Sequence, residues 1–120
     1  MTQKQMINAY ITLVRLGGAQ MSVRAAHTLY QLRKKLESSY QFCSEREQLI
    51  IEKYHGKIVN GTITFDNEEA AQCAQADLRD LYDLDIDAGI EAVILSMDDI
   101  KGVSLSVNDM EALEGFVVLT

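Results

Sequence analysis

The longest helical pattern of the chain reads SVRAAHTLYQLRKKLESSYQFCSEREQLIIEKY and covers residues 22–54. Its apolar side chains fall seven residues apart, at Leu29, Leu36, Cys43 and Ile50. Such a repeat is typical of a helix that packs along a second helix. The 120 residues include no proline, which would cost about 3 kcal/mol inside a helix. We therefore expect one long central helix with a helical partner.

A tight β-hairpin is predicted directly after this helix. Asn60-Gly61 separates two short runs of mostly β-branched residues, 57–59 and 62–64. Both central positions of a two-residue hairpin turn need a positive φ, which Asn and Gly adopt most readily. Two strands this short are marginal by themselves, so the hairpin needs support from the rest of the fold.

A second helix is predicted over residues 67–83. Asp66 and Glu69 form the expected capping box, and alanines and leucines recur at helical spacing. If the two helices fold back about the hairpin, Tyr54 lies opposite Asp66. Basic side chains of the long helix then lie near the acids at the end of the second helix. Exposed ion pairs contribute only about 0–1 kcal/mol each, so they select the register more than they hold the fold.

A further helix is predicted near the N-terminus, over residues 3–16. Thr2 and Gln5 form its capping box. Gly17-Gly18 ends it, because glycine adopts the left-handed cap conformation without strain.

The C-terminal third is predicted to contain short elements. Residues 90–95 read as a strand that extends the hairpin into a small sheet, and residues 103–105 as a second short strand. Asn108 begins a short helix that ends at Gly115. The apolar tail, residues 116–119, either docks on the core or exposes an edge for a partner.

These elements define the expected fold class, α+β. We expect an antiparallel helical hairpin with a long central helix, plus a small antiparallel β-sheet or hairpin. Residues 1–120 have the size of a single domain, and no linker or repeat divides them.

The charge is divided unevenly along the chain. Residues 1–57 contain nine Lys or Arg and four Asp or Glu, whereas residues 58–120 contain two and fourteen. Helix pairing uses part of this acidity and leaves a negative surface, which speeds association with a partner of opposite charge. We expect this surface to bind a protein partner through Asp77, Asp80, Asp83, Asp85 and Asp87.

No arrangement of residues predicts catalysis, a cofactor or a bound metal. The two histidines, His27 and His55, have no ligand or serine at motif spacing. Residues 83–90 resemble the start of a calcium-binding loop, but Gly89 falls one position late and Ile94 replaces the bidentate glutamate. We therefore expect a protein that is not an enzyme.

The sequence also leads to expectations about cellular location and nucleic-acid binding. No apolar run approaches the roughly 20 residues of a membrane helix, and no apolar signal-peptide block follows Met1. We expect a cytoplasmic protein with no membrane contact, in which Cys43 and Cys73 stay reduced. The pI near 4.7 argues against direct nucleic-acid binding.

Several short motifs follow one another along nearly the whole chain. They are INA (7–9), LRKKLE (32–37), EREQLIIEKY (45–54), NG (60–61), an acidic-apolar segment before residues 90–95, and NDMEALEGF (108–116). In this order they resemble a family of small uncharacterised proteins encoded by phages and prophages of Gram-positive bacteria. His55 and Gly115 depart from that family's pattern, which usually has Gly and Pro there, and both positions are helix ends. The resemblance implies a phage origin and a bacterial host cytoplasm, and it implies no reaction.

Together these features predict a non-enzymatic phage accessory protein that acts by binding a protein of the host or the phage. Two roles stay open. One is an acidic inhibitor of a host nucleic-acid-handling or defence system. The other is a phage structural, tail-assembly or chaperone-like component. We also expect self-association into a homo-oligomer through the apolar tail and the uncovered parts of the helical seam.

Overall fold

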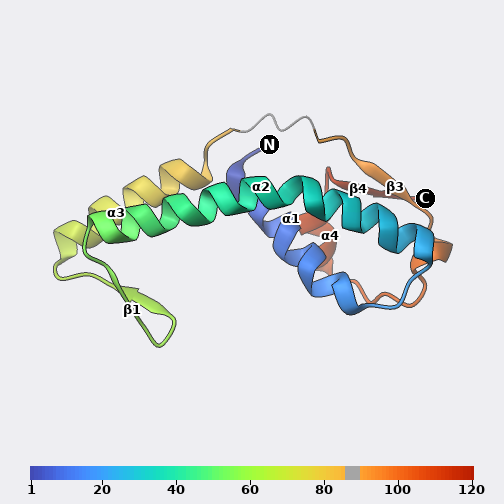
Figure 1. Ribbon diagram of the computed structural model, residues 1–120, viewed down its shortest axis with the longest axis horizontal. Helices are drawn as coiled ribbons and strands as arrows, with labels where there is room; N and C mark the ends of the chain where they lie inside the picture. Colours follow the sequence, from blue (N-terminus) through green and yellow to red (C-terminus); the bar gives the residue numbers. More distant parts are fainter. Residues whose placement is uncertain (86–89) are drawn as a thin grey trace.

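The computed structural model describes residues 1–85 and 90–120. The elements in chain order are α1 (Gln3–Arg15), the 3₁₀ helix η1 (Leu16–Gly18), α2 (Val23–Lys53), β1 (Lys57–Val59), β2 (Thr62–Thr64), α3 (Glu68–Tyr82), β3 (Val93–Leu95), the 3₁₀ helix η2 (Met97–Ile100), α4 (Val107–Leu113) and β4 (Val117–Leu119). The molecule is elongated, 53 × 31 × 21 Å along its principal axes. α1, α4, β3 and β4 gather around the first half of α2, and α3 lies along its second half (Figure 1). The fold is α+β with a long central helix, as predicted.

Helix α1 begins at the predicted capping box. The Gln5 N–H donates to the Thr2 hydroxyl over 3.2 Å, and the Thr2 N–H donates to the Gln5 side chain over 2.8 Å. The predicted left-handed cap at the other end is wrong, because Gly17-Gly18 continue the helix as the 3₁₀ turn η1 with negative φ values. A 3₁₀ turn satisfies the last carbonyls equally well.

Helix α2 begins at Ser22, whose hydroxyl accepts a 3.1 Å hydrogen bond from the Ala25 N–H. Its apolar seam is buried as far as Cys43, and Leu32 and Leu36 are 1% and 0% exposed. Beyond this point the seam is only partly covered, and Leu49 is 53% exposed. The helix therefore has one well-buried half and one thinly covered half.

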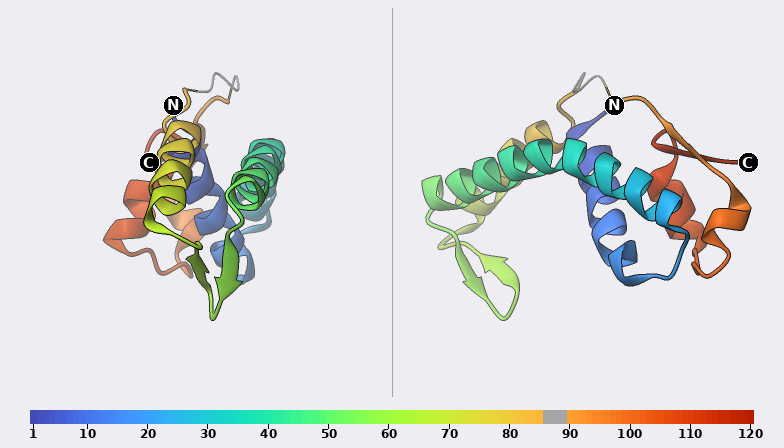
Figure 2. Two further views of the ribbon diagram at one scale, coloured as in Figure 1. Left: turned by 90° about the vertical axis from the view of Figure 1, so that its left-hand side faces the viewer. Right: turned by 45° about the vertical axis from the view of Figure 1, so that its right-hand side comes forward.

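Helices α2 and α3 pack as the predicted antiparallel pair, in a different register. The Tyr54 hydroxyl donates to Asp77 over 2.7 Å, so Tyr54 contacts a residue well beyond the predicted Asp66. The far end of α3 is held by α1, where the Gln3 N–H donates to the Leu84 carbonyl over 2.9 Å. The predicted register is wrong because it treated the hairpin as a continuation of the helix axes, whereas the hairpin projects to one side (Figure 2).

The caps of the two later helices also differ from prediction. Asn67, not Asp66, caps α3 by accepting a 2.7 Å hydrogen bond from the Ala70 N–H. Ser106, not Asn108, caps α4 in a capping box with Asp109. Asn67 lies one residue after the predicted cap, and Ser106 lies two residues before it. Each side chain accepts a hydrogen bond from a backbone N–H of the first helical turn, as a cap must.

The predicted β1–β2 hairpin is confirmed. The strands pair antiparallel, with Ile58 opposite Ile63. The turn residues Asn60 and Gly61 have φ values of 52° and 79°, as a two-residue turn of this kind requires. All six strand residues are exposed, so the hairpin stands away from the core.

The C-terminal strand pairing differs from prediction. β3 pairs parallel with β4, so that Val93 lies opposite Val117 and Leu95 opposite Leu119, and residues 90–95 do not extend the hairpin. Parallel strands need a long crossover, which η2, α4 and the segment between them provide. Residues 103–105 belong to this crossover and form no strand.

The apolar tail docks on the core. Phe116 is 3% exposed, and Gly115 precedes it with a φ of 83° that ends α4 as predicted. The main core cluster joins α1, α2, α4 and this tail, through Met6, Ala9, Leu13, Leu16, Leu32, Leu36, Leu113 and Phe116.

Candidate functional site

The predicted acidic surface is divided by the structure, and Asp77 belongs to the helix pair. Its carboxylate accepts the Tyr54 hydrogen bond and lies 3.6 Å from the Lys53 ammonium. The hydrogen bond to Asp77, together with burial, raises the pKa of Tyr54. The sequence predicts Asp77 on the negative surface that helix pairing leaves over, but this carboxylate takes part in the helix pairing itself.

Three other predicted acids lie at the end of α3 nearest α1: Asp80, Asp83 and Asp85. Asp80 and Asp83 are exposed, and neither forms an ion pair within residues 1–85 and 90–120. Asp85 accepts from the Met1 ammonium over 3.0 Å. Asp87 lies outside the described residues. The structure thus leaves Asp80 and Asp83 as an exposed acidic pair on α3.

A partly buried polar cluster joins α1, α2 and α3. The Tyr82 hydroxyl donates to Glu47 over 2.7 Å, and the Cys43 thiol lies 3.8 Å from the same carboxylate oxygen. Gln3 is fully buried and donates to the Ser39 carbonyl over 2.7 Å. Burial raises the pKa of both Cys43 and Tyr82, so both groups stay protonated. Their chemistry is that of a structural contact, because a nucleophilic cysteine needs a lowered pKa.

An apolar groove of about 640 Å³ lies between the β3–β4 pair and α4. We use the name apolar groove for the surface lined by Leu95, Val103, Met110, Val117, Val118 and Leu119 with their neighbours on α2, η2 and α4. Successive side chains of a strand point to opposite faces, so a groove lined by three consecutive β4 residues runs along the strand's edge. Met110 and Val118 are 53% and 46% exposed.

Acidic side chains are the charged component of the apolar groove. Glu111 and Glu114 of α4 line it and are exposed, and none of the described lining residues is basic. This groove was not predicted from the sequence. The available signal was the apolar tail together with Val107 and Met110, but only the parallel pairing of β3 and β4 brings these segments together.

The β1–β2 hairpin forms a second exposed apolar feature, which we call the hairpin arm (residues 57–64). Ile58, Val59 and Ile63 are 62%, 52% and 38% exposed. At its base Phe65 packs beside Gly56 and Ile51, so closely that a Cβ on Gly56 would lie 2.8 Å from the Phe65 ring. The base of the hairpin arm is therefore fixed, whereas its strands are free to contact another molecule.

A polar cleft of about 620 Å³ lies between α1 and α4. Its buried carboxylate, Asp109, pairs with Arg15 and accepts from the Ser106 N–H. Both carboxylate oxygens are thus used in holding α1 and α4 together. His27 and His55 are exposed and lie outside this cleft.

Candidate metal ligands lie scattered in the described part of the chain. Within residues 1–85 and 90–120, no three His, Cys, Asp or Glu side chains cluster closely enough to hold an ion. The segment that resembles a calcium loop, residues 83–90, falls partly outside the described residues.

Comparison with protein-family models, with curated proteins and with solved structures finds no match to this chain. The resemblance to a phage family therefore stays a prediction. Among the described helices, none combines the length and the apolar character needed to cross a membrane.

Proposed function

We propose that this chain is a non-enzymatic binding protein that acts by docking on another protein. The observation that carries the proposal is the apolar groove, which pairs exposed Met110 and Val118 with the acidic Glu111 and Glu114. Exposed apolar patches rimmed by polar residues mark interaction sites. Such a surface suits an apolar segment that carries a basic residue at its edge.

Asp80 and Asp83 on α3 supply a second part of the proposal. Exposed carboxylates contribute little to affinity, but they speed the approach of a basic partner and make it sensitive to salt. We assign them a steering role, with the apolar groove as the docking surface. Asp77 and Asp85 contribute less, since each already has a cationic neighbour within the chain.

Of the two roles left open by the sequence, the apolar groove favours the assembly component. An inhibitor that mimics nucleic acid would need mainly exposed carboxylates, whereas the groove offers mainly apolar side chains to a strand or helix. The inhibitor stays the second candidate, favoured by Asp80 and Asp83. The phage origin rests on the resemblance alone.

Photo-cross-linking in cells tests this proposal. A cross-linking amino acid is placed at Val118 in the apolar groove and, as a matched control, at Val14 on α1, which is 49% exposed and lies outside the groove. We expect a distinct protein adduct from position 118 and not from position 14. Mass spectrometry then identifies the adduct: morphogenesis proteins support assembly, and host nuclease subunits support inhibition. Equal adducts from both positions would refute docking in the groove.

A further inference from the structure

We propose that the apolar groove of one copy receives the hairpin arm of a second copy, so that chains join head to tail. This inference rests on the proposed function, because it names the partner of the same groove. It commits to one occupant, the segment of residues 57–64.

The chemistry of the two surfaces is complementary. The hairpin arm presents Ile58, Val59 and Ile63 to solvent, and its single charged residue is Lys57. The charged residues that line the apolar groove are Glu111 and Glu114. An apolar arm with one cation thus meets an apolar groove with an anionic rim.

The backbone of the two surfaces is also suited to contact. β4 has one neighbouring strand, β3, in the described part of the chain, and the apolar groove runs along its edge. An edge strand offers unpaired N–H and C=O groups to an added strand. β1 and β2 likewise form a sheet of two strands, so each has an outer edge that can pair.

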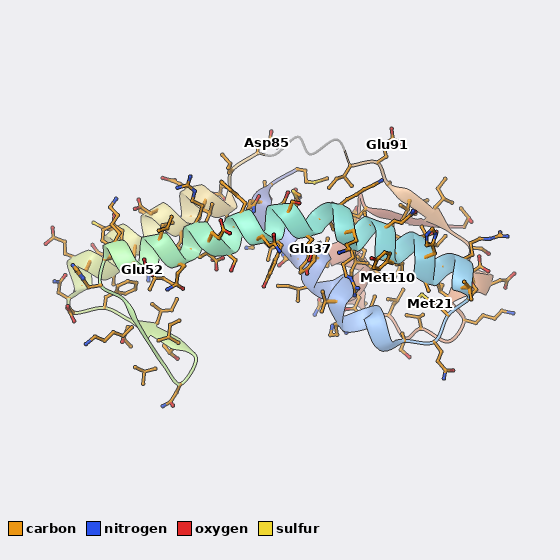
Figure 3. All side chains as sticks on the ribbon, in the orientation of Figure 1. Met21, Glu37, Glu52, Asp85, Glu91 and Met110 are labelled. Carbon is orange, nitrogen blue, oxygen red and sulfur yellow. The ribbon has the colours of Figure 1, made fainter. Side chains whose placement is uncertain are left out.

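The two surfaces lie at opposite ends of the molecule. Met110 lines the apolar groove, and Figure 3 labels it well away from Glu52, which lies close to the hairpin end of α2. Leu29 of α2 lines the apolar groove, whereas the hairpin arm follows Lys53 at the other end of this helix. About 24 helical residues, roughly 36 Å at 1.5 Å per residue, therefore separate the two surfaces. The contact must therefore join two copies.

Such a contact is heterologous, because it joins two different surfaces of identical chains. After two copies join, one keeps a free groove and the other a free arm, so head-to-tail association continues into rings or filaments and does not stop at a dimer. The contact area is small, so we expect weak association that depends on concentration. The gain is the burial of a short hairpin that is marginal in water.

Sedimentation velocity on the full chain provides the first measurement. The average mass of the wild-type protein should keep rising with concentration up to about 1 mM, the weak end of specific affinities. It should not level off at the mass of a dimer. A monomer throughout this range overturns the proposal, and so does a plateau at the dimer.

Two variants at exposed positions test the surfaces separately. The arm variant carries Ile58→Thr and Ile63→Thr, which keep β-branched residues in the strands and remove apolar contact. The groove variant carries Met110→Lys and Val118→Lys, which repel Lys57. Val14→Lys is the matched control, since Val14 and Val118 have nearly equal exposure, 49% and 46%. Circular dichroism confirms that each variant is folded.

We expect each variant to be monomeric alone and the control to associate as the wild type does. An equimolar mixture of the two variants should form a dimer that cannot grow, because one chain supplies the intact groove and the other the intact arm. A mixture that stays monomeric overturns the proposal. If a foreign protein cross-links at Val118 while the wild-type chain stays monomeric, the proposed function stands and this inference fails.

Discussion

The hydroxyl of Tyr82 donates a 2.7 Å hydrogen bond to the carboxylate of Glu47, and this contact fixes the end of α3 against the second half of α2. The Tyr54–Asp77 hydrogen bond repeats the arrangement near the other end of the pair. In both cases a tyrosine on one helix meets a carboxylate on the other. These two contacts hold the register of a helix pair whose described apolar contacts are few.

The tyrosine contacts predict a loss of stability at alkaline pH. The pKa values of Tyr82 and Tyr54 are both raised in the folded state, whereas an unfolded tyrosine titrates near pH 10. Their contribution is fully present below about pH 10 and declines above it, because the unfolded chain then loses protons more readily. Thermal unfolding followed from about pH 8 to 11 should show this decline.

Tyr82→Phe should lower stability by about 1 kcal/mol at neutral pH and weaken the alkaline decline. Tyr30→Phe, at a residue that is 48% exposed, is the matched control and should leave both unchanged. An unchanged alkaline decline in a Tyr54→Phe and Tyr82→Phe double variant would contradict this account.

The two cysteines should react at different rates. Cys73 is exposed, whereas Cys43 is buried and its pKa is raised by that burial. A thiol-specific colorimetric reagent should label Cys73 promptly in the folded protein and Cys43 only after denaturant is added. Cys73→Ser should abolish the rapid phase. A rapid phase that persists in this variant would show that Cys43 is accessible.

Two leucines of α2 differ in burial, and we expect their truncation to differ in its effect on stability. Leu36 is 0% exposed and Leu49 is 53% exposed. Leu36→Ala should lower the free energy of unfolding by about 2–5 kcal/mol, and Leu49→Ala by less than about 0.5 kcal/mol. Urea denaturation measures both. Equal losses would mean that Leu49 is covered in solution, for instance by another copy.

Substitutions at two adjacent positions after α2, His55 and Gly56, should have opposite effects on stability. His55 has a φ of 56°, which costs an L-residue about 1–2 kcal/mol and glycine nothing. His55→Gly should therefore stabilise the protein by up to about 1 kcal/mol. Gly56→Ala should destabilise it, because a Cβ there would meet Phe65 and Ile51 at 2.8 and 2.9 Å. Thermal unfolding gives both signs, and the same sign for both changes would contradict the packing described.

The acidic pair on α3 predicts a kinetic effect. Asp80→Asn with Asp83→Asn should slow association with a basic partner, once one is identified at Val118, and flatten its salt dependence. Folding should be kept or slightly improved, because Asp83 lies at the C-terminal end of α3, where negative charge is unfavourable. Asp77→Asn should instead destabilise the helix pair. An on-rate unaffected by the double substitution would exclude steering.

The elements were predictable from the sequence to the extent that local chemistry determines them. The Thr2–Gln5 capping box, the Asn60-Gly61 turn and the extent of α2 all depend on neighbouring residues, and the structure confirms each. The register of α2 and α3 was not predictable in this way. It depends on the Tyr54–Asp77 and Tyr82–Glu47 hydrogen bonds and on the Gln3–Leu84 contact with α1. All three join segments far apart in the chain.

The candidate site was less accessible to sequence reasoning. The acidic residues were identified, but which of them stay exposed depends on Tyr54 and Lys53 reaching Asp77. The apolar groove exists only because β4 pairs parallel with β3. Residues 93–95 and 117–119 carry no signal of that pairing, since their short apolar runs fit either strand direction.

Helix α2 crosses from the well-packed end of the molecule to the thinly packed end without a break. Beyond Cys43, Ile51 is its one buried residue in the described chain. The amides of one helix should therefore exchange hydrogen for deuterium in a gradient, slowly before Cys43 and quickly near Lys53. The last turns can fray and re-form while the compact end stays closed. Because the base of the hairpin arm packs on Ile51 in these turns, we expect the arm to change direction together with them.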